Sequence, residues 1–554
     1  MDAHVETRNM AVLAAFFVLW TQSSCVEIDM RGRADDRMAS KHPDKGSSHH
    51  YTASDISTDI PRAPRANTTI LTVFTSYGCG CTGSGGAPRT FTTNEQVLEA
   101  LRQACDGVEF VVWEGTRGAA YDEVQRNRDS YDGILIIGNL DGDYRLAFTG
   151  LPTIVVYNLF EFMNLPYDLL ATGTFPEDAI LKGGADYKDT KILTAQLDRR
   201  NLCDPSVSEK MFKDLLYKIK LIQVIQEIAK TRILMLTSRT DEAIARVNYR
   251  GDFNQSFPQD HNARYTRNLK ELLGVEIVRV GAAEFYELFR TVDIATAEEV
   301  ADEWIKGARW VEASRAEIIK SARAYLAIGA LRERYYCNAV STHIRSVTGS
   351  GKLKDRFNPG IGLELGFKTR GIQAVCQNYP DILISQVLAY LLTGRPSMLG
   401  DVIYDIDNSV EIVLHCGIPI NPYGDERRIP YTIRTHAESP VRDIPEEPGS
   451  STGLTAEWPV GEPVTFWEIH SLNRTIRLHT GEVVNGHDIY TGGEDLDNVM
   501  CTAKLIAVLN ARRMRDQHVP YLYGIHTNVT LGDLRQQIKD IAVLLGFDTI
   551  QSDR

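Results

Sequence analysis

The chain has 554 residues, 43% of them hydrophobic and 24% charged, a composition typical of a folded protein with room for about three or four domains. Its formal net charge of −13 at pH 7 argues against nucleic acid or an anionic membrane surface as the main partner, because both attract basic proteins. Nine dispersed cysteines without a CxxC pair disfavour a structural zinc site and favour a reducing compartment such as the cytoplasm.

Residues 1–66 are predicted to form a leader that is disordered or signal-like. The run between Met10 and Cys25 resembles the core of a signal peptide, but its roughly ten apolar residues are too few to span a membrane. Two acids and one arginine precede it, where a signal peptide needs net positive charge. Two interpretations remain open: export through this segment, or an extension upstream of a later start such as Met38. We expect a cytoplasmic protein without stable membrane association, with export as the alternative.

Residues 67–190 are predicted to form a first α/β domain, because buried apolar strands alternate with amphipathic helices along this stretch. The strands are expected at 69–78, 108–115, 132–140 and 151–159, and the helices between them at 93–105 and 119–129. Such alternation is typical of a doubly wound fold, in which helices cover both faces of a parallel sheet.

Residues 191–372 are predicted to form a second doubly wound α/β domain, which carries Glu364. A long helix at 207–230 leads into its first strand at 231–238. The remaining helices are expected at 265–274, 295–308 and 311–335, and the remaining strands at 275–280 and 336–344.

Residues 373–554 are predicted to form a β-rich C-terminal domain, either a sandwich or a small barrel, which carries Asp381 and His526. Its short alternating strands are expected at 400–407, 409–417, 463–472 and 474–484, and an amphipathic helix at 531–547. The stretch 437–462 is rich in Pro, Glu, Gly and Ser and is expected to form a long surface loop or lid.

Three distant side chains form a candidate metal site. Asp381 follows the apolar run Ile372–Cys376, which predicts a buried strand, and ligands usually bind at such strand ends in α/β proteins. Together with Glu364 and His526, it offers two carboxylates and an imidazole, which can hold a divalent metal and leave positions open for substrate. Each residue also has a structural interpretation: Asp381 as a helix cap, Glu364 as an exposed helix residue and His526 as a hydrogen-bonded strand histidine.

Several stretches, in their shared order, resemble the L-fucose isomerase and L-arabinose isomerase superfamily across most of the chain from about residue 69. The stretches are 132–160, 372-IQAVCQNYPDIL-383, 401-DVIYDIDNSVEIVLHCGIP-419, 460-VGEPVTFWEI-469 and 525-IHTNVTLGDL-534. The resemblance implies three domains, a homo-oligomer that is a trimer or a hexamer, and a small sugar as substrate.

By the same resemblance, the protein is expected to be an intramolecular oxidoreductase that interconverts aldoses and ketoses through a cis-enediol. It implies a divalent metal, typically Mn²⁺, held by Glu364, Asp381 and His526, with the two carboxylates as the catalytic groups. Gln377 stands close to Cys376, where the family often has a glutamate. This departure keeps an alternative open, a carbohydrate-binding or regulatory protein that retains the isomerase fold without turnover.

Three further residues are candidates for sugar binding. His415 either lines the pocket or is a core histidine of its β segment. Cys79 lies in a Gly-rich turn after the first strand, which could bind a ligand oxygen. Asn528 lies two residues after His526 in the same C-terminal motif. Because the turns after the first strands lack GxGxxG and GxxxxGK[ST] spacing, a nucleotide-dependent oxidoreductase is disfavoured.

Overall fold

The computed structural model describes residues 67–75, 93–138, 145–158, 190–199, 203–237, 244, 259–343, 358–436, 449–491, 502–517 and 526–553. The predictions for the leader 1–66, for its Met10–Cys25 segment and for the turn that contains Cys79 lie outside these residues. No helix in the described part of the chain combines the length and apolar character that a bilayer-spanning helix needs.

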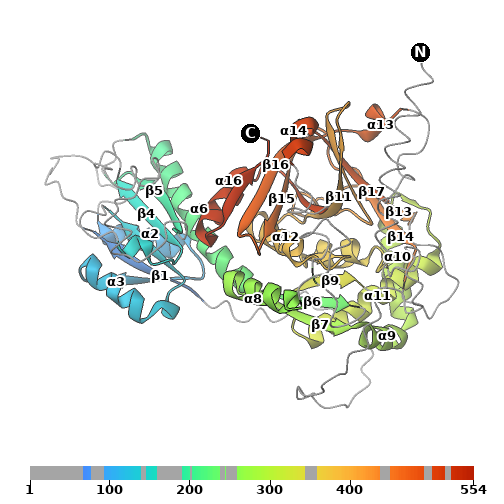
Figure 1. Cartoon of the computed structure of the whole chain (residues 1–554), viewed down its shortest axis with the longest axis horizontal. Helices are drawn as coiled ribbons and strands as arrows, with labels where there is room; N and C mark the ends of the chain where they lie inside the picture. Colours follow the sequence, from blue (N-terminus) through green and yellow to red (C-terminus); the bar gives the residue numbers. More distant parts are fainter. Residues whose placement is uncertain are drawn as a thin grey trace.

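The first α/β region is built on a five-stranded sheet in which every pair of neighbours is parallel. Its spatial order is β2-β1-β3-β4-β5, with β1 Thr68–Phe74, β2 Val108–Trp113, β3 Gly133–Ile137, β4 Thr153–Asn158 and β5 Ile192–Leu197. Strand β5 lies beyond residue 190, the expected end of the first domain, and completes this sheet by pairing with β4. The sheet forms one end of the molecule (Figure 1).

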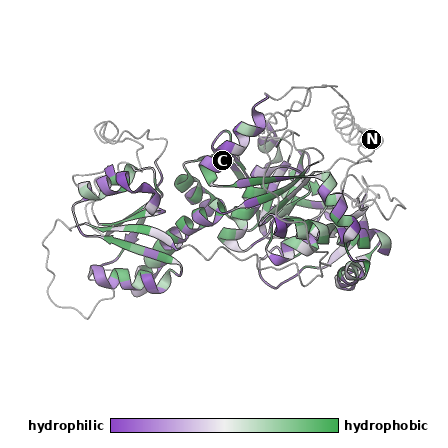
Figure 2. Cartoon of the chain, turned by 90° about the horizontal axis from the view of Figure 1, so that it is seen from below, coloured by the Kyte–Doolittle hydropathy of each residue, from purple (hydrophilic) through white to green (hydrophobic). Residues whose placement is uncertain are grey.

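Alternate residues of these strands pack against helices on opposite faces of the sheet. Ile70 and Leu135 share a core cluster with α2 (Asn94–Ala104) and α6 (Pro205–Ala229). Leu71 belongs to a second cluster with α3 (Arg117–Arg126) on the other face. Figure 2 shows the corresponding division, with hydrophobic residues on the strands and hydrophilic residues on the outer helices. The doubly wound pattern predicted for this region is therefore present in its packing.

The second parallel sheet has the order β10-β9-β6-β7 and likewise carries helices on both faces. Its strands are β6 Arg232–Thr237, β7 Glu276–Gly281, β9 Ala339–His343 and β10 Ala374–Val375. The helices that share a core cluster with Leu234 and Leu236 are α9 Ala282–Thr291, α10 Ile294–Gly307 and α11 Arg315–Arg334. Those that share a cluster with Ile233 and Met235 are α8 His261–Leu273 and α12 Pro380–Thr393.

The C-terminal strands close into a barrel, which was one of the two arrangements expected there. The seven-stranded sheet has the order β15-β18-β11-β12-β17-β16-β19, and β15 also pairs with β16, so that all strands except β19 form a closed antiparallel ring. The strands are β11 Met398–Asp405, β12 Val410–His415, β15 Pro463–His470, β16 Thr475–Val483, β17 Ala503–Val508, β18 His526–Leu531 and β19 Asp548–Gln551. A short helix, α13, spans Gly486–Ile489, and α14 spans Ala511–Gln517.

Within the stretch 437–462, where a long loop was expected, the structure has a strand. This strand, β14 (Thr452–Ala456), pairs with β13 (Tyr431–Thr435), and β13 pairs in turn with β8 (Trp310–Val311). The loop prediction is therefore wrong at these residues, because a tertiary pairing partner outweighs the turn-rich composition.

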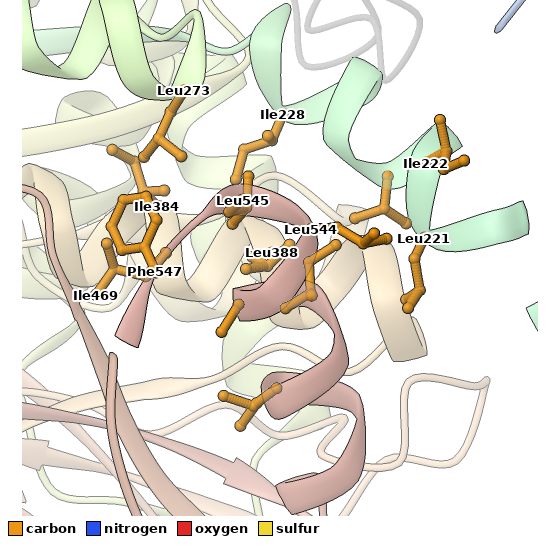
Figure 3. Close-up of a cluster of buried hydrophobic side chains, with 14 of the residues drawn as sticks. Leu221, Ile222, Ile228, Leu273, Ile384, Leu388, Ile469, Leu544, Leu545 and Phe547 are labelled. Atoms are coloured by element: carbon orange, nitrogen blue, oxygen red, sulfur yellow. The ribbon is translucent and has the colours of Figure 1, made fainter. Parts of the chain in front are cut away.

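Helix α12 connects the parallel sheet to the barrel, since it packs against β9 on one side and β15 and β18 on the other (Figure 1). Figure 3 shows the apolar junction around it, where Leu221 and Ile222 of α6 lie near Leu544 of α16 (Arg535–Leu545). Burying one such Leu or Ile side chain stabilises the fold by about 1.5–3 kcal/mol. This shared core holds α12, and with it the segment that begins at Cys376, in a fixed position.

Candidate functional site

The candidate site lies where the carboxyl edge of the second parallel sheet meets the barrel. The segment between β10 and α12 is fixed there by hydrogen bonds to the sheet. Ser341 Oγ of β9 lies 2.9 Å from the carbonyl oxygen of Gln377 and 2.8 Å from Asn378 Oδ1. Asn378 Nδ2 donates in turn to the carbonyl oxygen of Leu236 at 3.2 Å. These bonds hold the neighbouring Cys376 and Tyr379 against the barrel strands β12 and β18.

Asp401, His415 and His526 form a cluster whose potential ligand atoms all lie within 4.8 Å of one another. Asp401 of β11 and His526 of β18 are direct partners in an antiparallel pair, which places their side chains on one face. His526 Nε2 lies 3.0 Å from Asp401 Oδ1, and the rings of His415 and His526 are 6.0 Å apart. Both histidines are 3% exposed, so the cluster is largely shielded from solvent.

The His526 ring is held in place from α12 as well as from the barrel. Tyr379, at the start of that helix, packs against His526 with ring centroids 4.5 Å apart. A ligand whose ring is fixed by packing loses little conformational entropy when it binds a metal.

A second cluster shares His415 and adds two thiols. Cys376 Sγ lies 3.2 Å from His415 Nδ1 and 3.8 Å from Cys416 Sγ, and neither cysteine forms a disulfide. The ligand atoms of Cys376, His415 and Cys416 also lie within 4.8 Å of one another. The hydrogen bond with Cys376, together with burial, raises the pKa of Cys416 to about 12. Cys416 is therefore a protonated thiol at neutral pH, and a metal would have to displace this proton in order to bind it.

Glu364 lies next to these clusters in a short π-helix, Leu363–Phe367. It is 8% exposed, so its interpretation as an exposed helix residue is wrong. Its Oε1 accepts a hydrogen bond of 3.0 Å from Lys368 Nζ, which also donates to the carbonyl oxygen of Ser397 at 2.8 Å. Its Oε2 has no hydrogen-bond partner among the described residues. Burial raises the pKa of Glu364, and the positive charge of Lys368 offsets part of this effect.

A cavity of about 20 Å³, hereafter the ion-sized cavity, is lined by Glu364, Lys368, Cys376, His415 and Cys416 among others. This volume suffices for one ion or one water molecule. It is far below the roughly 300–1,000 Å³ of typical small-molecule pockets. The cavity as it stands therefore suits a metal or a water rather than a sugar.

Asp381 is buried at 1% exposure in the first turn of α12, whose N-cap is Tyr379. Because the helix begins at Pro380, the interpretation of Asp381 as its cap is wrong. Its Oδ2 accepts a hydrogen bond of 3.2 Å from the backbone N–H of Ser471, just after β15. Among the described residues, neither ligand cluster contains Asp381 or Glu364.

The structure thus brings His526 together with His415, as two of the expected site residues, and brings Glu364 to the same cavity as His415. Asn528 is fully buried on β18, where its Nδ2 donates to Thr530 Oγ1 at 3.5 Å. The sequence reasoning missed Asp401, Cys376 and Cys416 as possible ligands. The expected strands at 400–407 and 409–417 were a usable signal, because a hairpin of this kind places Asp401 beside the end of the second strand, where His415 and Cys416 lie.

Neither a scan against models of known protein families nor a search of curated protein sequences finds a match to this chain. What the protein does must therefore be inferred from the geometry of its site and from the resemblance of its sequence motifs.

Proposed function

We propose that the protein is a metal-dependent aldose–ketose isomerase whose divalent cation binds to Asp401, His415 and His526. The observation that carries this proposal is the convergence of these three side chains within 4.8 Å. Two imidazole nitrogens and one carboxylate oxygen are a donor set that suits Mn²⁺, Fe²⁺ or Zn²⁺. Three protein ligands leave coordination positions for two oxygens of a small sugar. Mn²⁺ is the metal that the motif resemblance favours.

In this proposal Glu364 is the catalytic base. A bound cation would supply Lewis-acid polarisation of the sugar carbonyl. Glu364 takes the proton from C2, beside the carbonyl, and returns it to C1, while the hydroxyl proton passes from the oxygen on C2 to the oxygen on C1; together these transfers convert an aldose into a ketose without net oxidation. Two features of Glu364 support this role: the partner-free Oε2, and the raised pKa, which brings the carboxylate closer to the range in which a general base works best near neutral pH.

Asp381, which the resemblance implies as a ligand, has a different role in this proposal. Its hydrogen bond to the Ser471 backbone joins the first turn of α12 to the end of β15. We assign it the function of positioning α12, and thereby Tyr379 against His526.

The architecture supports the same family of enzymes at a coarser level. Two parallel sheets followed by a closed antiparallel barrel are compatible with the three domains that the resemblance implies. The boundaries expected at residues 190 and 372 each fall just before a strand of the preceding sheet, β5 and β10. We infer from the resemblance that the protein forms a trimer or a hexamer, and from its dispersed cysteines that it acts in the cytoplasm, with export as the alternative.

A second candidate function is a carbohydrate-binding or regulatory protein that keeps the isomerase fold without turnover. Two observations favour it. The ion-sized cavity holds about 20 Å³, too little for a sugar beside Glu364. In addition, Gln377 replaces an expected carboxylate next to Cys376, so one acid–base group fewer is present.

The two functions separate in one experiment on the full chain. We would measure bound metal after incubation with Mn²⁺, and interconversion of a panel of aldoses and ketoses, for wild type, His526→Ala and the control His487→Ala. His487 is an exposed histidine of α13 that belongs to neither ligand cluster. If the protein is an isomerase, His526→Ala should lose both bound metal and turnover, and His487→Ala should keep both. Sugar binding without turnover would favour the second function, and retention of metal by His526→Ala would contradict the proposed site.

A further inference from the structure

A second cavity, of about 720 Å³, lies between α10, α11, the Leu363–Phe367 helix and the segment that leads into β13. Its volume falls within the range that small organic ligands occupy in proteins. Its buried floor is aromatic and includes Trp304, Tyr325 and Tyr431. We call it the cationic cavity, because of the side chains that line its exposed part.

Four basic side chains, Lys306, Arg309, Arg370 and Arg428, line the exposed part of this cavity, with Glu303 as the one acid. Within the part of the chain that the structure describes, none of the four forms an ion pair with a carboxylate. This clustering runs against the overall charge of the chain, which is −13. Like charges around one concave surface focus a positive potential there and raise the local concentration of anions.

The floor of the cationic cavity carries a buried hydroxyl with no partner. Tyr325 is 2% exposed, and its hydroxyl has no hydrogen-bond partner among the described residues. Tyr431 differs, because its hydroxyl donates to the carbonyl oxygen of Trp304 at 2.7 Å. Buried hydroxyls in folded proteins are usually paired, so an orphan in a residue that lines a cavity leaves a donor available to a water or to a ligand.

The Tyr325 ring is fixed where a ligand would meet it. Phe367 packs edge-on against the ring at 4.7 Å, and the Arg370 guanidinium lies over the ring at 5.9 Å. Gly366 makes this packing possible, because a Cβ at that position would approach the Tyr325 ring to 2.4 Å. Gly366 and Phe367 therefore fix the Tyr325 ring from the Leu363–Phe367 helix, and the 3-10 helix Lys368–Arg370 that follows it supplies the guanidinium.

From these observations we propose that the cationic cavity binds a phosphate-bearing small molecule of about nucleotide size. The phosphate lies among Arg370, Arg428, Lys306 and Arg309, because guanidinium groups pair with phosphate oxygens in a bidentate manner and lysine adds a point charge. The flat or apolar part of the molecule covers the aromatic floor, and the Tyr325 hydroxyl donates to one of its oxygens. This proposal does not depend on the isomerase function.

The Leu363–Phe367 helix also connects this cavity to the candidate site. Leu365 and Gly366 line the cationic cavity, whereas Glu364 of the same helix lines the ion-sized cavity. A ligand in the cationic cavity therefore contacts the element that carries the proposed base.

The test is calorimetric titration of the full chain with adenosine monophosphate, adenosine, inorganic phosphate and citrate. Adenosine monophosphate should bind, and adenosine should bind at least tenfold more weakly, since a charge-assisted bond contributes about a factor of ten or more. Arg370→Ala and Arg428→Ala should each weaken nucleotide binding by about tenfold. The matched control is Arg427→Ala, because Arg427 is exposed, pairs with Asp425 and does not line the cavity.

Tyr325→Phe tests the role of the Tyr325 hydroxyl through two measurements, the melting temperature of the free chain and its affinity for adenosine monophosphate. Because the hydroxyl has no hydrogen-bond partner among the described residues, its removal should leave the melting temperature unchanged or higher. The same change should weaken binding of adenosine monophosphate by about tenfold. Equal affinity in wild type, Arg370→Ala and Arg428→Ala would overturn the proposal, as would a wild-type chain that binds none of the phosphate compounds. Binding of citrate but not of adenosine monophosphate would overturn the assignment to phosphate.

Discussion

The two cavities that share the Leu363–Phe367 helix differ in size, burial and chemistry. The ion-sized cavity, of about 20 Å³, is lined by potential metal ligands that are buried or partly buried, whereas the cationic cavity, of about 720 Å³, has an aromatic floor and exposed cations. Burial makes each unpaired polar group costly, so the small cavity favours a compact charged ligand. Exposed cations cost little on their own and mainly attract and orient an anion. One short helix thus lies between a small cavity lined by potential metal ligands and a larger cavity lined by cations and aromatic rings.

The largest effect is expected from removing the carboxylate that lines the ion-sized cavity. Glu364→Gln should lower kcat for sugar isomerisation by about 10²–10⁴-fold, because a positioned base contributes this much, and should leave Mn²⁺ binding within about threefold of wild type. Steady-state kinetics and a metal titration check both parts. Glu303→Gln, at the cationic cavity, is the matched control and should keep full activity. Full activity in Glu364→Gln would remove this residue from the mechanism.

The thiols should make the ion-sized cavity selective among metals. Cys376→Ser should weaken Zn²⁺ binding by about 10–100-fold and change Mn²⁺ binding much less, because thiolate is a soft ligand that prefers Zn²⁺. Competition titrations with a metal-sensitive dye measure both affinities. Cys337→Ser serves as the control, since Cys337 is buried and belongs to neither cluster. An equal loss for both metals would argue that Cys376 acts through packing alone.

Gly366 tests the wall that the two cavities share. A Cβ at this position meets the Tyr325 ring at 2.4 Å, so Gly366→Ala should destabilise the fold by about 1–3 kcal/mol and weaken adenosine monophosphate binding. Denaturant unfolding measures the change in the free energy of unfolding, and calorimetry measures the change in affinity for adenosine monophosphate. Gly281→Ala is the control, because its added Cβ has no heavy atom within 4 Å. Unchanged stability and binding in Gly366→Ala would show that the wall adapts without cost.

The smallest effect is expected at a buried carboxylate outside both cavities. Burial raises the pKa of Asp540, whose carboxylate accepts hydrogen bonds from Tyr217 and Gln536. A raised pKa means that Asp540 holds its proton more tightly in the folded state than in the unfolded state. The protonated carboxyl therefore contributes stability at low pH, and this contribution is lost as pH rises through the pKa of the folded state. Asp540→Asn should therefore stabilise the chain at pH 7 relative to wild type and lose this advantage below pH 3.8, the ordinary pKa of aspartate. Unfolding curves at both pH values check the sign.

The sequence predicted the layers of this fold better than the contacts of its site. Strand β3 was predictable because its residues form a short apolar run, the pattern of a fully buried strand, and all five of them are buried. The alternation of strands and helices indicated the parallel sheets. Strand β14 was not, since its pairing with β13 outweighs a loop-like composition.

At the site, the motif around His526 pointed to a histidine that lies in one of the two ligand clusters, but its neighbours depend on pairings between distant strands. The expected hairpin of β11 and β12 places Asp401 near His415, but only the β11–β18 register, which no local pattern reveals, brings it to His526. Asp381 was expected to bind a metal, and its contact with the Ser471 backbone arises from the docking of α12 onto the barrel. The local sequence pattern therefore predicts helices and strands, whereas the register between strands distant in the sequence determines which side chains come into contact.

The most direct measurement is a calorimetric Mn²⁺ titration of the full chain in three forms: wild type, Asp401→Asn and Arg428→Ala. The account predicts one Mn²⁺ site per wild-type chain, binding weakened by about 100-fold or more in Asp401→Asn, and unchanged binding in Arg428→Ala, which alters only the cationic cavity. Wild-type affinity in Asp401→Asn would contradict the metal centre at Asp401, His415 and His526, and with it the isomerase proposal.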